Sequence, residues 1–218
     1  MSVRARMAFA AALLATAAPE AANAALVTDP IGDFIGSYTG PQAGDLDVVS
    51  ANVTVIGANA VVSGTLNGAI GTTAGGFYVW GLDRGRGAST SNFAAIGQPG
   101  IIFDSVVVVR PGGASVVNDL VTGLSTPLPD SQITISGNSL QAIVPLSALP
   151  SEGFSTDHYL WDLWPRFSGA AGNAQIADFA PDDHDAPVTV PEPGSVALLA
   201  FGLTSFAALR RRRSSLVS

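Results

Sequence analysis

Four aspartates near the beginning of the chain have the side chains and spacing of a calcium site: Asp29, Asp33, Asp45 and Asp47. Calcium takes about six to eight oxygen ligands from carboxylates, backbone carbonyls and water. A Pro/Gly turn separates Asp29 from Asp33 and leaves its carbonyls free to join the shell. In an extended segment Asp45 and Asp47 point the same way, because side chains alternate. We therefore expect these four carboxylates to bind calcium; the alternative is that Asp29 and Asp33 only cap turns.

Catalytic chemistry has little support in the sequence. It contains no nucleophile elbow, zinc-protease motif or phosphate-binding loop. His158 has no identifiable nucleophile or orienting acid, so we expect it at a strand end or on the surface. His184 lies in an acidic segment, where we expect a solvated side chain. Outside the first 24 residues the glutamates are Glu152 and Glu192, which excludes a paired-glutamate glycosidase site but leaves an aspartate pair open.

Two tryptophans are candidates for binding sugar rings. Trp161 and Trp164 are three positions apart, so on an extended strand they point to opposite faces. We expect one ring to pack in the core and the other to be exposed, where it could stack on a polysaccharide. Core packing of both rings is the alternative.

The composition of residues 25–190 excludes several classes of function. Four arginines, no lysine and 15 acidic residues give this region a formal charge of −11. Such a surface repels nucleic acid, so we expect no nucleic-acid partner. The chain has no cysteine, which excludes thiol catalysis and cysteine-ligated metal centres. The 166 residues of this region are enough for one domain.

The sequence of the same region predicts a series of short strands. β-Branched and aromatic runs alternate with Gly- and Pro-rich turns, and no window has a convincing helical period. We predict an all-β fold, an antiparallel β-sandwich of about nine strands over residues 25–180. The acidic stretch 181–190 is predicted to be a linker. The expected strands are 46–56, 60–66, 77–82, 101–110, 114–121, 133–135, 140–144, 158–167 and 174–179.

The first 24 residues have the form of a secretory signal peptide. Arg4 and Arg6 precede an apolar run, Ala8 to Ala18, and Ala22-Asn23-Ala24 provides small residues for a cut after Ala24. We therefore expect an N-terminal signal helix that passes the chain to the secretion machinery. An uncleaved anchor is the alternative, but the run is short for one.

The C-terminal stretch, residues 191–218, combines three features in order. Pro191, Glu192 and Pro193 precede an uncharged stretch from Ser195 to Leu209, and an arginine cluster follows: Arg210, Arg211, Arg212 and Arg213. A helix of this length spans roughly 22 Å, short of a bilayer core, although arginine stems can snorkel. Arginines flank both apolar ends of the chain, so everything between them is directed outward.

This order of features resembles the PEP-CTERM sorting signal of Gram-negative bacteria. The resemblance rests on Pro191, Glu192 and Pro193, the apolar helix and the arginine cluster. It implies transient anchoring in the inner membrane, cleavage near the Pro-Glu-Pro by exosortase, and release to the cell surface. It also implies an association with biofilm and extracellular polysaccharide. The alternative is a tail anchor that is never cleaved.

The middle region also resembles the extracellular DOMON-like and carbohydrate-binding sandwiches. The resemblance rests on the opening Asp29–Asp33 segment and on Asp45–Asp47, which leads into a valine-rich strand. It implies calcium in the acidic loop and sugar or haem on a sheet face or loop edge. Both methionines lie in the signal peptide and His184 lies in the expected linker, which argues against haem.

Two functions follow as hypotheses. The first is a non-enzymatic, exosortase-processed surface or matrix protein that binds polysaccharide. The second is a secreted hydrolase that uses aspartates on extracellular polysaccharide. A cleft holding two facing carboxylates would favour the hydrolase, whereas a smooth sandwich with its acidic residues confined to loop edges would favour the binding module.

Overall fold

A computed structural model describes residues 26–191, which belong to one compact unit. The predicted signal helix with its cut after Ala24, and the predicted membrane helix from Ser195 to Leu209, lie outside the described residues. Within 26–191 the structure contains no helix of the length and hydrophobicity needed to cross a bilayer.

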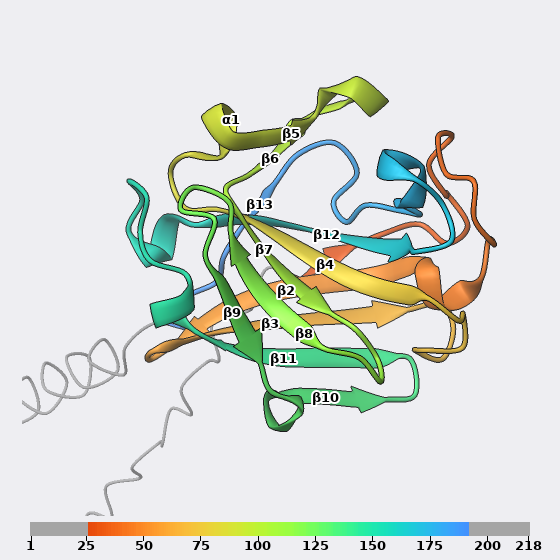
Figure 1. Ribbon diagram of the computed structural model, residues 1–218, viewed down its shortest axis with the longest axis horizontal. Helices are drawn as coiled ribbons and strands as arrows, with labels where there is room; N and C mark the ends of the chain where they lie inside the picture. Colours follow the sequence, from red (N-terminus) through yellow and green to blue (C-terminus); the bar gives the residue numbers. More distant parts are fainter. Residues whose placement is uncertain (1–25, 192–218) are drawn as a thin grey trace, which may run out of the picture. The chain divides into compact units, whose positions relative to one another are not determined.

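Two antiparallel sheets form the unit, and every strand pair in them is antiparallel (Figure 1). The first sheet has the order β1 (Val27–Thr28), β2 (Val48–Ile56), β3 (Asn59–Leu66), β11 (Ser139–Pro145) and β10 (Ile133–Ser136). The second has the order β13 (Ala186–Pro187), β12 (Leu160–Phe167), β4 (Gly76–Asp83), β7 (Ser105–Val109), β8 (Ser115–Asp119) and β9 (Ser125–Leu128). The all-β prediction is confirmed.

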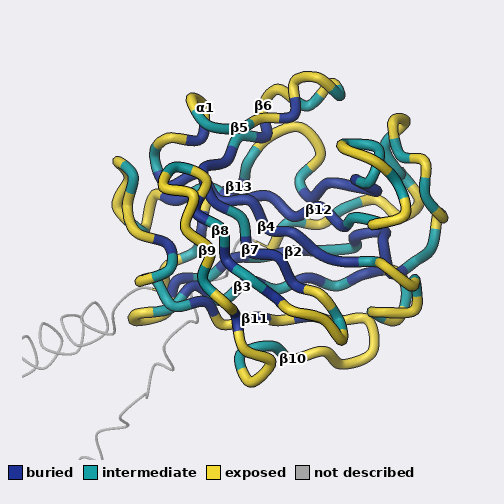
Figure 2. The backbone as a smooth tube through the Cα atoms, in the orientation of Figure 1, coloured by how far each residue is buried: buried dark blue, intermediate teal, exposed yellow. Residues whose placement is uncertain are grey.

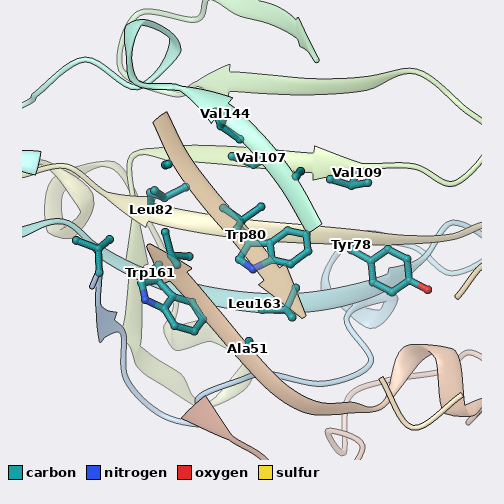
Figure 3. Close-up of a cluster of buried hydrophobic side chains, with 14 of the residues drawn as sticks. Ala51, Tyr78, Trp80, Leu82, Val107, Val109, Val144, Trp161 and Leu163 are labelled. Carbon is teal, nitrogen blue, oxygen red and sulfur yellow. The ribbon is translucent and has the colours of Figure 1, made fainter. Parts of the chain in front are cut away.

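Side chains alternate between the two faces of each strand, and those on the inner faces form the core between the two sheets. In β4, Tyr78, Trp80 and Leu82 are fully buried and point toward the first sheet, where they meet valines and alanines of β2, β3 and β11 (Figure 3). A Cβ on Gly64 would come within 3.0 Å of Leu163 and 3.4 Å of the Trp80 ring. Glycine at this position therefore lets the large rings of one sheet approach the backbone of the other.

A second apolar cluster covers the outer face of the second sheet. The short helix α1 (Gly87–Thr90) and the hairpin of β5 (Ser91–Phe93) and β6 (Gln98–Phe103) lie over this face (Figure 1). Phe93 meets the Trp164 ring edge-on at 5.0 Å between centroids, and Phe103 lies 4.9 Å from the same ring. The second sheet is thus buried on both faces at its centre, whereas exposed residues lie in the loops, at the hairpin tip and along the strands β9, β10 and β11 (Figure 2).

Several predicted strands are correct and others are not. The run 101–110 was expected to be one central strand, but it breaks at Asp104 into β6 and β7, which belong to different sheets. The break places Asp104 beside Arg84, whose backbone N–H and Nε donate to the buried carboxylate, while the backbone N–H of Asp104 still donates to the carbonyl of Leu82. Residues 174–179 do not form the expected strand: Ala174 and Gln175 end a 3₁₀ turn (Gly172–Gln175), and Ile176 forms an isolated bridge with Arg166. Pro127, in an expected loop, lies in the edge strand β9, where a missing N–H is tolerated.

The predicted linker, residues 181–190, is wrong. Ala186 pairs with Trp161 through β13, and Ala186 and Val188 are buried in the core. Thr189 donates its backbone N–H to Val53 and accepts from the N–H of Val55, so the segment also contacts the first sheet. The acidic composition of 182–185 concealed the alternation of small and β-branched residues that follows it. The folded unit therefore extends to about Pro191, and both cores lie wholly within it.

Candidate functional site

Five carboxylates gather where the opening loop of the chain meets its last segments. Ligand oxygens of Asp29, Asp33 and Asp182 lie within 4.8 Å of one another, and so do those of Asp33, Asp47 and Asp178. Asp33 belongs to both groups and therefore joins them into one aspartate cluster. The cluster brings together the loop after β1, the start of β2 and the segment after β12, which are far apart in the sequence.

Two of the five carboxylates are held in place by hydrogen bonds from the backbone. Asp178 accepts from the N–H of Val48 at 2.8 Å and from its neighbour Phe179 at 2.9 Å. Asp47 accepts from the N–H of Gly32 at 3.0 and 3.1 Å and from the Asn67 amide at 3.0 Å. Donors fixed in this way orient the carboxylates without neutralising the charge of the cluster.

Other oxygens beside or within the cluster are buried without any hydrogen-bond partner. They are Oδ2 of Asp29, Oδ1 of Asp33, Oδ1 of Asp185 and both carboxylate oxygens of Asp162. Asp162 lies in the middle of β12 and is completely buried. An ionised carboxylate buried without a partner costs several kcal/mol. Such a group therefore requires either a proton or a cation.

Burial and crowding raise the pKa values of several of these carboxylates. Burial, together with the charges of Asp185, Asp29, Asp178 and Asp182, raises the pKa of Asp162 well above its ordinary value. Burial and the neighbouring Asp178 and Asp33 raise the pKa of Asp29 to about 9. Burial also raises the pKa of Asp178 to about 7. Among residues 26–191, the ion pairs of arginine are to Asp104, Asp119 and Glu152, so no arginine is paired with a member of the cluster.

The predicted calcium ligands are only partly brought together. Asp29, Asp33 and Asp47 join the cluster, whereas Asp45 does not. Residues Gly44–Leu46 form a 3₁₀ turn, not an extended segment, so Asp45 and Asp47 point apart. The Asp45 carboxylate instead accepts hydrogen bonds from the backbone and hydroxyl of Thr73, at 2.7 and 2.5 Å. Asp45 is therefore a structural residue of a neighbouring turn.

Asp178 and Asp182 were not predicted as ligands, because their sequence surroundings indicated other structural roles. Asp178 was placed in a strand and Asp182 in a linker. A usable signal was Asp162, a charged residue inside the apolar run Leu160-Trp161-Asp162-Leu163-Trp164. A carboxylate in such a run needs a partner, which no local pattern identifies.

The donor set of the cluster fits a hard divalent cation. It consists of carboxylate oxygens, contains no histidine or sulfur ligand, and includes oxygens that are buried and unpartnered. Oxygen-only sites suit calcium and magnesium, and calcium tolerates the irregular geometry of loop carboxylates better.

The histidines show no catalytic arrangement. His158 is exposed, and its Nδ1 lies 2.9 Å from Ser155 Oγ and 3.1 Å from Asp157. In a catalytic triad the serine and the acid contact opposite ring nitrogens, whereas here both contact one nitrogen. His184 is likewise exposed and contacts Asp183.

The expected exposed tryptophan is absent from the folded unit. Trp161 and Trp164 do point to opposite faces, but their exposed fractions are 0% and 1%. Trp161 packs between the sheets, and Trp164 is covered by the aromatic residues of the β5–β6 hairpin. The prediction that one ring is exposed was wrong, because it did not foresee a third layer over the second sheet.

The grooves on the described surface include two that differ in size and lining. One, of about 250 Å³, lies over the serine- and threonine-rich face of the first sheet. The other, of about 720 Å³, lies between the second sheet and the β5–β6 hairpin, and we call it the hairpin groove. Neither is lined by an aspartate or a glutamate. The aspartate cluster is therefore separate from both grooves.

Comparison with known proteins identifies the C-terminal part of the chain. Residues 189–213 match a family described as the PEP-CTERM protein-sorting motif. The sequence-based identification of this motif is thereby confirmed, and it marks an exosortase-targeted, exported surface protein. Of its named residues, Pro191 is described and exposed, whereas Glu192, Pro193 and Arg210 to Arg213 lie outside the described residues. No curated protein matches the chain.

Proposed function

We propose that this PEP-CTERM protein is cleaved by exosortase beside its folded unit and remains at the cell surface as a non-catalytic, calcium-binding module for extracellular polysaccharide. The observation that carries the proposal is the separation of the aspartate cluster from the grooves. The aspartates of the cluster, which could serve an enzyme, line neither of the two grooves, each of which could receive a polymer. We call cleavage by exosortase the sorting part of the proposal, calcium binding the metal part and polysaccharide binding the ligand part.

The position of Pro191 supports the sorting part. Among residues 26–191, Thr189 is the last whose backbone is hydrogen-bonded to a sheet, and Pro191 is exposed two residues later. Cleavage near Pro191–Pro193 would therefore leave both sheets and both cores intact.

Processing predicts the mass of the mature protein. Protein recovered from the cell surface should lack roughly residues 1–24 and the stretch that follows the Pro-Glu-Pro. Intact-mass measurement checks both ends in one experiment. A surface form that keeps Arg210 to Arg213 would contradict cleavage and would support a permanent anchor. Replacing the four arginines with glutamine should reduce membrane retention, because orientation depends on them.

The aspartate cluster supports the metal part. We assign calcium to Asp29, Asp33, Asp47, Asp178 and Asp182, with Asp33 shared between the two groups. Bound calcium would neutralise carboxylates that burial and mutual repulsion otherwise disfavour. It would also join the opening loop to the last segment of the unit, so that the site acts on stability, not on a reaction.

The hairpin groove supports the ligand part. Its lining places asparagine, glutamine and arginine side chains, which can hydrogen-bond to sugar hydroxyls, over a floor of buried aromatic rings. A groove that lacks carboxylates can bind a polysaccharide but offers no acid pair to hydrolyse it.

A pull-down with residues 25–191 tests the ligand part against the hydrolase alternative. A panel of insoluble neutral and acidic polysaccharides should retain the protein, and the soluble fraction should gain no reducing sugar ends over time. Bovine serum albumin is a matched acidic control for non-specific retention. Retention with release of reducing ends would favour the hydrolase, and no retention by any polymer would reject the polysaccharide ligand.

A further inference from the structure

The hairpin groove contains a pair of arginines that the rest of the fold does not neutralise. Arg110 follows β7 and Arg166 lies in β12, and both line the groove. Their guanidinium carbons lie 4.6 and 6.0 Å from the centroid of the Phe77 ring. Both cations therefore contact the Phe77 ring, which belongs to the strand between β12 and β7.

Neither of these arginines has a carboxylate partner within the described part of the chain. The other two arginines of the unit are paired: Arg84 with Asp104 and Asp119, and Arg86 with Glu152. Arg166 donates one hydrogen bond, to the carbonyl of Gly172 at 2.9 Å, and its buried Nε has no partner. Burial and the neighbouring Arg110 lower the pKa of Arg166. A protein with 15 acidic residues in this unit thus keeps two cations together and apart from all of them.

Neutral polar groups surround the arginine pair. Asn118 lies on β8, and Asn173 and Gln175 lie on the 3₁₀ turn beside β12. Thr90, Ser91 and Asn92 line the side formed by the hairpin. Amides and hydroxyls of this kind donate to and accept from sugar hydroxyls. Only the arginines supply charge, so the groove selects for an anion that also carries many hydroxyls.

We propose that the hairpin groove binds an acidic polysaccharide, with uronate carboxylates placed on Arg110 and on Arg166 and the adjoining sugar hydroxyls on the surrounding amides. The proposal rests on the polysaccharide-binding function and specifies its ligand class. Arginine binds carboxylates through charge-assisted, often bidentate hydrogen bonds. The acidic surface outside the groove repels the same polymer, which confines binding to this site.

Binding of tetragalacturonate, which is too short to form calcium gels, tests the proposal. Isothermal titration of residues 25–191 at fixed low calcium should detect the acidic oligosaccharide, with affinity falling as salt is raised. A neutral maltotetraose should bind at least tenfold more weakly. Arg110→Gln and Arg166→Gln should each reduce the affinity for tetragalacturonate about tenfold or more. Arg86→Gln removes the same charge outside the groove and should leave the affinity within twofold.

The outcomes separate this proposal from the more general function. Wild-type affinity in both groove variants would overturn it, provided that their melting temperatures match that of the parent. If Arg166→Gln does not fold, Arg110→Glu still decides, because Arg110 is exposed and its replacement reverses the charge. Equal binding of maltotetraose and tetragalacturonate would overturn the acidic ligand while leaving polysaccharide binding intact. No binding of any oligosaccharide or polymer would reject both.

Discussion

Replacing Arg84 with methionine is expected to destabilise the folded unit by about 3–5 kcal/mol. Arg84 is completely buried, and its Nε lies 2.7 Å from Asp104 while its Nη2 lies 3.1 Å from Asp119. Its Nη1 also donates to the carbonyl of Pro150 at 2.9 Å. Without the guanidinium, the buried carboxylates of Asp104 and Asp119 would lose their cationic partner. The resulting drop in melting temperature should be roughly 10 °C or more for a unit of this size.

Arg86→Met is the matched control for this substitution. Arg86 lies two positions away, has an exposed side chain and is paired with Glu152 at 3.8 Å. A pair of this kind contributes less than about 1 kcal/mol. Urea denaturation of the two variants measures the difference directly. If Arg84→Met were as stable as Arg86→Met, the buried ion pairs would not hold the ends of β4, β7 and β8 together as the structure indicates.

Sequence patterns predicted the strands wherever alternation decides the structure. Residues 49–55 alternate between valine or alanine and polar residues, and they lie in β2, where Ala51, Val53 and Val55 face the core. A bulge between Val48 and Ser50 shifts this face by one residue, which a uniform alternation cannot anticipate. The break at Asp104 also escaped prediction, since the apolar run continues on both sides of it and its cause is Arg84, 20 residues away.

Only the part of the aspartate cluster that lies on one local turn could be predicted from the sequence. The Pro/Gly turn that carries Asp29 and Asp33 is a local signal, and it indicated calcium. The other part depends on a contact across 130 residues, between Asp178 and the N–H of Val48. No spacing within either segment encodes that contact, which arises when the segment after β12 packs against the start of β2. Asp45 shows the converse: its spacing from Asp47 was favourable, but a 3₁₀ turn directed it to Thr73.

Calcium is expected to raise the melting temperature of residues 25–191 by several degrees over the value in chelator. A ligand that binds only the native state stabilises it by about 2.7 kcal/mol at one hundred times its dissociation constant. For a unit of this size that is roughly 5–10 °C. Asp33→Ala should abolish most of the rise, because Asp33 belongs to both groups of the cluster. Asp47→Ala should do the same through the second group. Thermal melts with millimolar calcium and with chelator measure the difference.

The variants in chelator distinguish a ligand from a turn cap. Asp33 accepts no hydrogen bond from residues 26–191, and its Oδ1 is buried and unpartnered. Asp33→Ala should therefore melt no lower than the parent in chelator, since it removes one repulsive charge and no contact. Asp45→Ala should melt lower in both conditions, because it loses two hydrogen bonds from Thr73, yet keep the calcium-dependent rise. Asp183→Ala, which is exposed and outside both groups, should match the parent in both conditions. If millimolar calcium left the melting temperature of the parent unchanged, the calcium site would be rejected. If Asp33→Ala melted lower than the parent in chelator, Asp33 would be a turn-capping residue and not a calcium ligand.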